Sequence, residues 1–519
     1  MSASPPDPLV AYAQAQPDKP AVIEDRPDGR RTIWTYAALN RQANRLANLL
    51  LALGVQPGDK VVWCARNSPG VVRMVHAARK IGATAVPLNY RLTPAEAAYI
   101  VEDCDAALVY TDAESMELFV GIRSAAPRVR HVLTFEGPPA ADMLDAETAL
   151  AAASDAEPAM AAGEQAATMI YTSGTTGRPK GAYRTGLGNP EQIQQLVAAI
   201  GYRPDDVYLT TGPLYHSGPG GFLRIAHLLG NTVVVQRRFD PEDWLRLVEA
   251  YRVTTTFSAP TPIRLVCNLP GPVKARYDRS SMRRLIANAA PWSFALKEAY
   301  LADFPEDSLW EVYGSTELGV NTVLAPTDQR RKPGSCGRAA PGVTIKLFDD
   351  EGREVTAPYV PGALHIRSPS VFEGYYKDRE TYEAARRGDF FTVGDIAYRD
   401  DEDYYFICDR KSDMIISGGV NVYPAEVEAA LERHPGILDV AVFGVPDDHW
   451  GEAVHAVVVR RDAALSADTV ADFAREHLAG YKVPRSVEFV EEIPRTGSGK
   501  ILKRLLREPH WAGRDRRVS

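Results

Sequence analysis

The sequence predicts an α/β fold, with a large N-terminal part of parallel-rich sheets and a smaller α+β part at the C-terminus. Strand and helix patterns alternate over the first hundred residues, resume near residue 168 and continue to about residue 304, and shorter hairpin-like strands follow from residue 343. Alternating strands and helices favour βαβ units and parallel sheets. A chain of 519 residues is too long for one compact core, so at least two domains are expected.

The N-terminal segment contains the pattern of a βαβ unit. Thr35 can cap a helix that ends at Gly54, because its side-chain oxygen can accept from the first turn. Residues 60–65 then read as a buried strand, residues 70–81 as a helix and residues 84–88 as a second strand. Two strands joined by a helix predict parallel pairing.

The second half of the chain changes character. Hairpins are predicted around residues 345–354 and 398–408, and a break is expected after Arg410. We therefore expect a large domain over residues 1–411 and a small one over residues 412–519. The helices and strands of the small domain are expected at residues 424–434, 439–445, 453–460 and 468–478.

Composition and charge exclude several classes of protein. Hydrophobic residues make up 45% and charged residues 24%, and the net charge is −8, which argues against nucleic acid as a partner. The five cysteines are odd in number and form no CxxC pair or zinc spacing, as expected for free thiols in a reducing cytosol.

The N-terminus lacks a basic and apolar leader, and no apolar run is long enough to span a membrane, so no signal peptide or transmembrane segment is expected. We expect a cytoplasmic protein. Peripheral membrane contact stays open, as does the choice between a monomer and a homodimer.

Residues 171–181, YTSGTTGRPKG, carry the strongest local signal. An apolar strand leads into hydroxyls, glycines and one lysine. Polyphosphate requires such groups, since glycines bring backbone N–H groups close and Lys180 adds charge. The alternative is a solvated turn. A Walker A loop is excluded because Gly181 follows the lysine where that motif has Ser or Thr.

This string resembles the phosphate-binding signature of the superfamily of acyl/aryl-CoA ligases, adenylation domains and firefly luciferase. The resemblance extends from about residue 9 to about residue 506. It implies ATP-dependent adenylation, a large domain that includes a small β-barrel-like part, and a mobile C-terminal domain. In this loop it implies ATP contacts at Thr172, Ser173, Gly174, Thr175, Thr176, Gly177 and Lys180.

Two further stretches match the ATP site of that superfamily. In YGSTE, residues 313–317, the resemblance implies that Tyr313 stacks on adenine, Thr316 contacts phosphate and Glu317 holds Mg²⁺. Residues 287–292, ANAAPW, match the stretch along adenine and the acyl group, although Asn288 and Trp292 depart from the usual residues. The implied ATP contacts in the two stretches are Asn288, Ala289, Ala290, Pro291, Tyr313, Gly314, Ser315 and Thr316.

The resemblance also implies which residues contact the ribose of ATP, which position is the interdomain hinge and which residues contact coenzyme A. Asp395 matches the carboxylate that binds both ribose hydroxyls, and Arg410 the arginine beside it. Ser412 stands where the superfamily usually has Asp or Lys at its interdomain hinge, which leaves the energetics of domain motion open. Backbone and side-chain contacts to coenzyme A are implied at Ser417, Gly418 and Gly419.

Lys500, at the end of PRTGSGK, matches the catalytic lysine on a mobile glycine-rich loop. A kinase-type loop is excluded because Ile501 follows it. Nothing in the sequence shows whether Lys500 is modified. His216 is the other single residue of interest. A lone histidine is often structural, but the resemblance places it beside the acyl carboxylate and the thioester channel.

The acyl pocket is expected to be roomy and apolar. Its expected residues have little side-chain bulk, and no Lys or Arg occurs in the stretches that supply them. A fatty acid, an alicyclic or steroid-derived acid and an aryl acid all fit. The expected acyl-binding residues are Tyr215, His216, Gly218, Gly220, Gly221, Ser258, Ala289 and Gly319.

The implied activity is an acid–CoA ligase with ATP, Mg²⁺ and coenzyme A. A carboxylate attacks the α-phosphorus of ATP, which gives acyl-AMP and pyrophosphate, and the thiol of CoA then takes the acyl group. The alternatives are an acyl-AMP ligase that loads a carrier-protein phosphopantetheine, a luciferase-like oxygenase, and a non-catalytic binding protein on a decayed scaffold. The implied catalytic residues are Lys500, Lys180, Thr316, Glu317 and His216.

Overall fold

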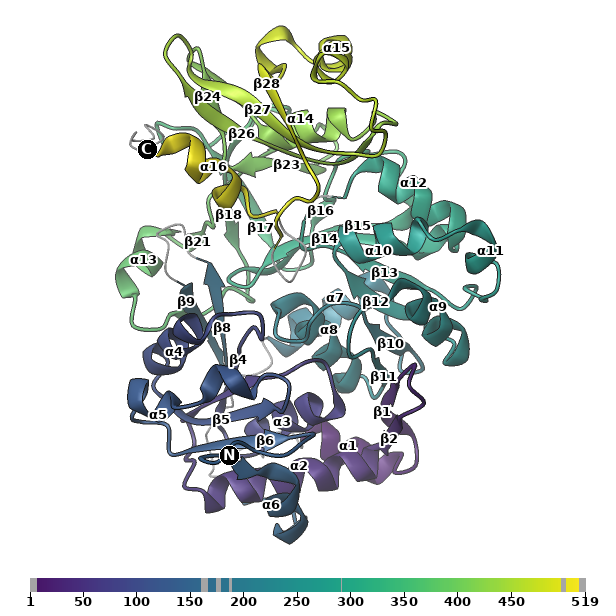
Figure 1. The fold of residues 1–519 in the computed structure, drawn as a ribbon, viewed down its shortest axis with the longest axis vertical. Helices are drawn as coiled ribbons and strands as arrows, with labels where there is room; N and C mark the ends of the chain where they lie inside the picture. The colour runs from purple at the N-terminus through teal and green to yellow at the C-terminus, as the bar shows by residue number, and fades with distance from the viewer. Residues whose placement is uncertain are drawn as a thin grey trace.

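The computed structural model describes residues 7–159, 167–173, 179–185, 189–290, 292–495 and 501–512. The N-terminal elements lie at the bottom of the view and the C-terminal sheet at the top (Figure 1). No described helix is both long and apolar enough to cross a membrane. The architecture is mixed α/β, as the sequence predicts.

A nine-stranded sheet, here called sheet A, forms one layer of the large part. Its order is β16-β15-β14-β13-β12-β10-β11-β1-β2, with a parallel centre from β14 to β1 and antiparallel edges. Its strands are β1 (Pro20–Asp25), β2 (Arg31–Thr35), β10 (Val207–Thr210), β11 (Thr232–Val235), β12 (Thr255–Ser258), β13 (Arg284–Ala287), β14 (Leu309–Ser315), β15 (Gly319–Leu324) and β16 (Arg338–Ala339).

A second sheet of eight strands, sheet B, has the order β19-β9-β8-β4-β3-β5-β6-β7 and is parallel from β8 to β7. The predicted βαβ unit is confirmed, since β3 and β4 pair in parallel around helix α3 (Pro69–Lys80). The strands of sheet B are β3 (Lys60–Cys64), β4 (Thr84–Pro87), β5 (Ala106–Asp112), β6 (His131–Phe135), β7 (Leu144–Asp145), β8 (Ala167–Ser173), β9 (Pro179–Thr185) and β19 (Gly374–Tyr375).

Helices α2 (Tyr36–Ala52), α3 and α8 (Ser217–Leu228) share a core with residues of both sheets, among them Trp63 of β3 and Val233 of β11. The predicted cap of α2 is present, because Thr35 Oγ1 accepts a hydrogen bond from the N–H of Ala38 at 3.2 Å. The three helices therefore hold sheets A and B against each other.

Further helices cover the outer faces and the loops of the large part. They are α1 (Pro8–Ala15), α4 (Pro94–Asp103), α5 (Ile122–Ala125), α6 (Ala146–Ala152), α7 (Pro190–Ile200), α9 (Pro241–Ala250), α10 (Pro260–Cys267), α11 (Gly271–Lys274), α12 (Phe294–Asp303) and α13 (Arg379–Ala384).

The region predicted to be barrel-like is an antiparallel sheet of six strands whose pairing, over the described residues, does not close into a barrel. The hairpin predicted around residues 398–408 is confirmed as β22 and β23. The hairpin predicted near residue 349 is present but short: it has the bridge between Phe348 and Glu354 and the backbone hydrogen bonds from Asp349 N–H to Arg353 O and from Val355 N–H to Leu347 O, while β17 forms its ladder with β18. The strands are β17 (Thr344–Phe348), β18 (Gly362–Arg367), β20 (Arg386–Arg387), β21 (Phe390–Phe391), β22 (Asp395–Arg399) and β23 (Tyr405–Arg410).

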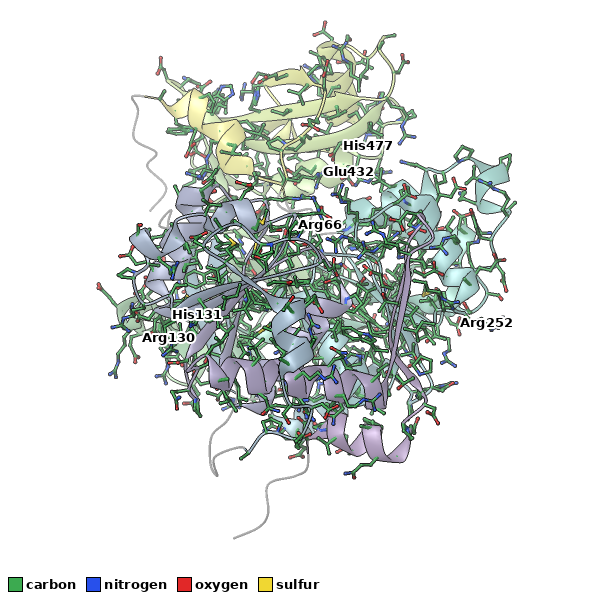
Figure 2. The ribbon with its side chains drawn as sticks, turned by 60° about the horizontal axis from the view of Figure 1, so that its bottom comes forward. Arg66, Arg130, His131, Arg252, Glu432 and His477 are labelled. Carbon is green, nitrogen blue, oxygen red and sulfur yellow. The ribbon has the colours of Figure 1, made fainter. Side chains whose placement is uncertain are left out.

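The C-terminal part has its own core of buried Ile, Val and Leu side chains between a five-stranded sheet and helices. It meets the rest of the molecule near Glu432 (Figure 2), which lies 3.5 Å from the guanidinium of Arg264 on α10. Its elements are β24 (Ile415–Ser417), β25 (Val420–Val422), α14 (Pro424–Leu431), β26 (Ile437–Asp447), β27 (Gly451–Arg460), α15 (Ala467–His477), β28 (Ser486–Val490) and α16 (Lys503–Trp511).

A buried ion pair anchors β14, the strand that leads into residues 313–317. Lys297 is 1% exposed, and its ammonium donates to the carboxylate of Glu311, which is 9% exposed. A buried charge that loses its partner costs about 3–5 kcal/mol, whereas an exposed pair contributes about 1 kcal/mol or less.

We predict that Lys297→Met lowers the free energy of unfolding by about 3–5 kcal/mol, because Glu311 is left buried without its cation. Thermal and urea unfolding of the purified variant measure this loss. Lys346→Met, which removes the exposed partner of Glu354, is the control and is expected to change little. The double variant Lys297→Met/Glu311→Leu should recover much of the loss, and equal effects of the two single variants would contradict the prediction.

Candidate active site

A cavity of about 1080 Å³ opens where sheets A and B meet the six-stranded sheet. Its walls come from β8, β9, α8 and the turn between β14 and β15, together with Arg410 of β23 and Arg495. The predicted residues that line it are Thr172, Lys180, His216, Gly218, Gly221, Asn288, Ala289, Gly314, Ser315, Thr316, Glu317, Gly319 and Arg410.

The predicted phosphate loop connects β8 and β9, which pair in antiparallel register with Thr172 opposite Lys180. Gly174, Thr175, Thr176, Gly177 and the side chain of Ser173 lie outside the described residues. Thr172 Oγ1 donates to Glu317 Oε1 at 3.0 Å, and the hydroxyl of Tyr375 donates to the same oxygen at 3.2 Å. The fold thus joins two motifs that are 145 residues apart.

Lys180 is held at the cavity wall by groups that the sequence did not indicate. Its ammonium lies 2.8 Å from Asp378 Oδ2 and donates to Thr381 Oγ1 at 2.5 Å. The hydrogen bond from Lys180 lowers the pKa of Asp378 below its ordinary value. The aspartate lies just before α13, so the signal was a helix N-cap with no visible relation to the loop.

The segment 313–317 forms the end of β14 and a tight turn into β15. Gly314 is required there, because an added Cβ would lie 2.1 Å from the carbonyl oxygen of Gly319. Thr316 Oγ1 donates to Ser217 Oγ at 2.9 Å. This contact brings the N-terminal end of α8, with His216 as its N-cap residue, to the motif.

The two residues predicted to contact ribose are direct neighbours across the β22–β23 hairpin. Asp395 pairs in register with Arg410, and Arg410 Nε lies 3.5 Å from Asp395 Oδ1. The hydroxyl of Tyr313 donates to Asp395 Oδ2 at 2.5 Å. Burial, and then the charge of Asp395, raise the pKa of Tyr313 well above its ordinary value, so the hydroxyl stays protonated as a donor.

In the stretch after β13, Asn288, which departs from the usual residue at its position, makes side-chain hydrogen bonds to the protein's own backbone. Asn288 Nδ2 donates to the carbonyl of Val312 at 2.6 Å, and Asn288 Oδ1 accepts from the N–H of Ala289. Ala289 has φ +72°, a left-handed conformation that this side-chain contact supports. Ala290 follows it, and Pro291 lies outside the described residues.

The predicted acyl-binding residues divide into three groups. The first group lines the main cavity and consists of His216, Gly218, Gly221, Ala289 and Gly319. Gly220 lines a smaller adjoining pocket of about 50 Å³ rather than the main cavity. Tyr215 and Ser258 are buried, and neither belongs to the lining of the two pockets. Of the glycines on α8, only Gly221 leaves open space, since a Cβ on Gly218 would lie 2.3 Å from the ring of Phe257 and one on Gly220 would lie 2.6 Å from Leu214 O.

Sequence reasoning missed seven of the described arginines in the cavity wall, of which Arg184 and Arg224 lie on β9 and α8. Arg184 on β9 donates to the carbonyls of Thr316, at 3.1 Å, and Ser370, and Arg224 on α8 donates to Thr168 Oγ1 at 3.0 Å. The sequence could have indicated Arg224, because it follows His216 by eight residues and a residue at that spacing lies on the same face of a helix. The prediction of an apolar acyl pocket rested on stretches without Lys or Arg, and the stretch on α8 ends at residue 222, two residues before Arg224.

The residues predicted to contact coenzyme A form a tight turn in the C-terminal sheet. Ser417 ends β24, and Gly418 and Gly419 have φ +60° and +79°, as a two-residue hairpin turn requires. None of the three belongs to the lining of the cavity. Lys500 lies outside the described residues, but Arg495 and Ile501, which flank its loop, pair as a β-bridge, and Arg495 lines the cavity.

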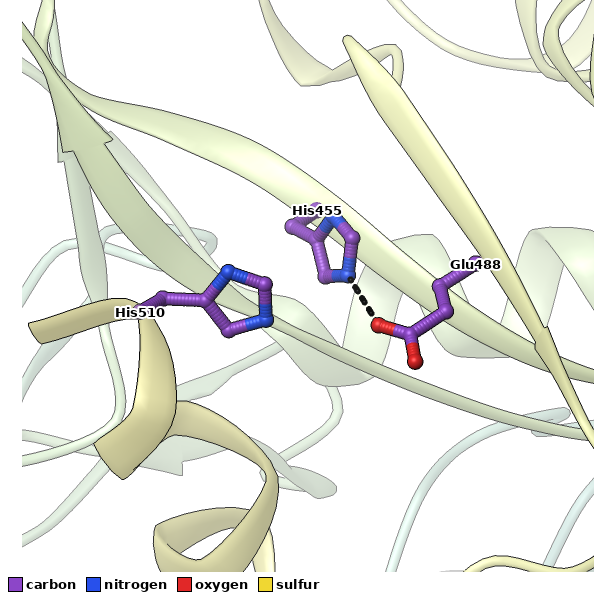
Figure 3. A group of neighbouring side chains, drawn as sticks. All are labelled: His455, Glu488 and His510. Atoms are coloured by element: carbon purple, nitrogen blue, oxygen red, sulfur yellow. Dashed lines mark ion pairs between the residues drawn. The ribbon is translucent and has the colours of Figure 1, made fainter.

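A separate group of potential metal ligands lies in the C-terminal part (Figure 3). His455 Nε2 is 3.6 Å from Glu488 Oε2, and the ligand atoms of His455, Glu488 and His510 all lie within 4.8 Å of one another. Burial lowers the pKa of His455. None of the three lines the cavity, so they contribute nothing to its chemistry.

Two protein-family models match the segments of the chain that contain these motifs. The family model for AMP-binding enzyme matches residues 9–376, and the model for the AMP-binding enzyme C-terminal domain matches residues 426–500. A feruloyl-CoA synthase from an Amycolatopsis species is 37% identical over 478 residues, which cover 91% of this chain and 93% of that protein.

The long-chain-fatty-acid–CoA ligase FadD13 of Mycobacterium tuberculosis is 34% identical over 505 residues, which cover 97% of this chain and 98% of that protein. The crystal structure of the anthranilate CoA ligase AuaEII in complex with anthranoyl-AMP has a TM-score of 0.86 at 26% identity and covers 97% of this chain and 96% of that one.

The chain therefore belongs to the AMP-binding enzyme family. It is an acyl-CoA synthetase of the adenylate-forming superfamily, an AMP-forming acid–thiol ligase whose substrates include ATP and coenzyme A.

The glycines on α8 generate a matched pair of predictions. Gly221→Ala should stabilise the protein by about 0.5–1 kcal/mol, because the added methyl meets no atom within 4 Å and alanine favours a helix. Gly218→Ala, three residues earlier, should cost about 1–3 kcal/mol because the ring of Phe257 must move. Thermal unfolding of both variants provides the measurement, and equal shifts would contradict the packing described for α8.

Proposed function

We propose that this enzyme activates a hydrophobic carboxylic acid (fatty, alicyclic or steroid-derived, or aryl) as acyl-AMP and passes the acyl group to coenzyme A. The observation that carries the proposal is the single cavity in which Thr172, Thr316 and Glu317 come together from distant segments. The hydrogen bond from Thr316 to Ser217 joins this polar end to helix α8, whose glycines border the rest of the cavity.

The nucleotide would lie against the β22–β23 hairpin. Asp395 accepts from Tyr313 and faces Arg410, so its carboxylate is already oriented by two neighbours. In the proposed complex Asp395 accepts the ribose hydroxyls, the ring of Tyr313 stacks on adenine, and the backbone of residues 288–290 borders the base. The position of Asn288, whose amide is bonded to Val312, favours a supporting role for its side chain.

Glu317 has the properties of a magnesium ligand. It is 8% exposed, and the hydrogen bonds from Thr172 and Tyr375 to its carboxylate both reach Oε1; within the described chain no Lys or Arg forms an ion pair with it. Oε2 is therefore available to a hard cation, which prefers carboxylate and phosphate oxygens. A bound Mg²⁺ would offset charge on the phosphate oxygens of ATP.

In the first half-reaction a carboxylate oxygen of the acid bonds to the α-phosphorus, and the bond from that phosphorus to pyrophosphate breaks. Thr172 and Thr316 donate to phosphate oxygens, and Lys180 exchanges Asp378 for the leaving pyrophosphate. Lys500 bridges the acid and the α-phosphate. Fixed donors in a cavity shielded from water supply most of the stabilisation in such reactions.

In the second half-reaction the sulfur of CoA bonds to the acyl carbon, and the bond to AMP breaks. We propose that residues 412–519 move as a unit relative to residues 1–411, so that Lys500 leaves and the turn of Ser417, Gly418 and Gly419 arrives. The separate core of the C-terminal part supports such a motion. Since all five cysteines are free, the cytoplasm stays the proposed compartment.

Two other functions would use the same cavity. An acyl-AMP ligase would pass the acyl group to the phosphopantetheine of a carrier protein, and a decayed scaffold would bind ATP without turnover. The retention of Lys180, Glu317, Asp395 and Arg410 around one cavity favours catalysis over the decayed scaffold.

The first test is pyrophosphate release by the purified protein with ATP and Mg²⁺ over a panel of acids, with and without CoA. We expect sustained turnover that requires both CoA and an acid with an apolar body. Release that stalls after about one turnover without regard to CoA would favour the carrier-protein acceptor. Absence of release with every acid would overturn the proposed activity.

We also predict that Lys500→Ala abolishes adenylation yet largely spares transfer from supplied acyl-AMP to CoA, because its ammonium acts only on the phosphoryl transfer. The two half-reactions are measured separately, by pyrophosphate release and by thioester formation. Arg504→Ala is the control, since Arg504 is an exposed cation near the same loop and pairs only with Glu508 in the described residues. Equal loss of both half-reactions in Lys500→Ala would contradict a step-specific lysine.

A further inference from the structure

Most arginines in the cavity wall are neutralised by carboxylates. Arg224 is an exception: within the described residues it forms no ion pair, and its guanidinium donates to the neutral hydroxyl of Thr168. The neutralised pairs are Arg66 with Glu114 at 2.6 Å, Arg237 with Glu114 at 2.8 Å, Arg238 with Glu114 at 2.5 Å, Arg410 with Asp395 at 3.5 Å and Arg495 with Asp439 at 2.7 Å.

Arg224 is charged at neutral pH although its surroundings oppose the charge. Burial and then the nearby charge of Arg184 lower its pKa to about 10, which still leaves the guanidinium protonated. Arg184 itself donates to backbone carbonyls and lies within electrostatic reach of the carboxylates of Glu373 and Glu317, whereas Arg224 forms no ion pair in the described residues. An uncompensated cation in a substrate cavity is unfavourable for folding, and such groups are concentrated at functional sites.

The position of Arg224 separates it from the phosphate end of the cavity. Thr168, which accepts its hydrogen bond, precedes Thr172 by four residues on β8, a distance of about 13 Å along a strand. On α8, Arg224 follows Ser217 by seven residues, or about 10 Å of helix rise. Along β8 and α8 the backbone of Thr168 and Arg224 is thus set back from Thr172 and Ser217, while the guanidinium of Arg224 lies near Arg184, whose own guanidinium donates to the carbonyl of Thr316 at 3.1 Å.

The smaller pocket beside Arg224 is largely apolar. Arg224 belongs to the wall of the main cavity and also to the wall of the smaller pocket, where its neighbours include Ile170, Leu214 and Leu223. Gly221, on the same helix, leaves the space beside it open. A ligand that reaches from Thr316 to Arg224 therefore needs an apolar middle and an anionic end.

We infer that Arg224 binds a second carboxylate at the far end of the acid substrate, so that this enzyme acts on dicarboxylic acids with an apolar spacer. A guanidinium matches a carboxylate with two parallel hydrogen bonds, and Arg184 adds a second positive charge nearby. One carboxylate is activated beside Thr316 and Glu317, and the other stays at Arg224. The inference rests on the proposed ligase function and narrows its substrate class.

The test compares acids of equal length with one and two carboxylates: hexanoate with adipate, and octanoate with suberate. We expect the wild-type enzyme to have the higher kcat/KM for the dicarboxylates. Arg224→Met should reduce kcat/KM for the dicarboxylates by about 30–100-fold, the size expected for a charge-assisted pair, and leave the monocarboxylates and the KM for ATP almost unchanged. Arg252→Met is the control, since Arg252 is an exposed arginine at the edge of the molecule (Figure 2) and does not belong to the lining of the cavity.

Calorimetric titration with suberate provides a readout that does not depend on turnover. Binding to the wild-type enzyme and its loss in Arg224→Met would support the inference, and equal binding would overturn it. Should Arg224→Met fail to fold, Arg224→Lys keeps the positive charge but lacks the planar guanidinium that can form two parallel hydrogen bonds. It is expected to reduce kcat/KM for the dicarboxylates by a smaller factor.

The outcomes separate the two proposals. Faster turnover of monocarboxylates by the wild-type enzyme would overturn the dicarboxylate inference and keep the ligase. A rise in the KM for ATP in Arg224→Met, with an unchanged ratio between acids, would mean that the anion at Arg224 is a phosphate, which also overturns it. No turnover with any acid would remove the ligase proposal, and the suberate titration would then decide the binding site by itself.

Discussion

The hydrogen bond between Thr172 and Glu317 joins sheet B to sheet A at the polar end of the cavity, and the other site residues take their places around it. Thr172 brings the end of β8, which leads into the phosphate loop. Glu317 belongs to the turn after β14, and the hydrogen bond from the neighbouring Thr316 to Ser217 connects this turn to the start of α8. A chemistry that needs phosphate, cation and carboxylic acid in one place depends on this junction, because no single sheet supplies all the groups.

Charge is distributed unevenly around that junction. Lys180 is balanced by Asp378, and Arg410 by Asp395, so the nucleotide end contains cations that are already paired. Arg224 has no carboxylate of the described chain to balance it, and it faces an otherwise apolar region. Paired groups can exchange partners when ATP binds at little cost, whereas an unpaired buried cation gains most from an anionic ligand.

Much of the fold follows from local patterns. The cap at Thr35, the parallel pairing of β3 and β4 and the β22–β23 hairpin are all encoded by residues close in sequence. The hairpin near residue 349 follows from the same kind of signal, but it stays short because β18 offers a longer partner strand to β17. Local turn chemistry thus identifies a turn, but competition among strands decides the pairing.

The sequence by itself determined the adenylate-forming class, and it predicts the ATP-site residues and a division into a large and a small domain, because these depend on short motifs with a fixed order. Only the tertiary structure decided which side chains meet. In the folded protein the amide of Asn288 donates to the carbonyl of Val312, Asp378 forms an ion pair with Lys180, and Arg224 lies in the cavity wall without a carboxylate partner among the described residues. Periodicity predicts the face on which a side chain lies, but the charge that it meets comes from elements distant in sequence, which only packing brings together.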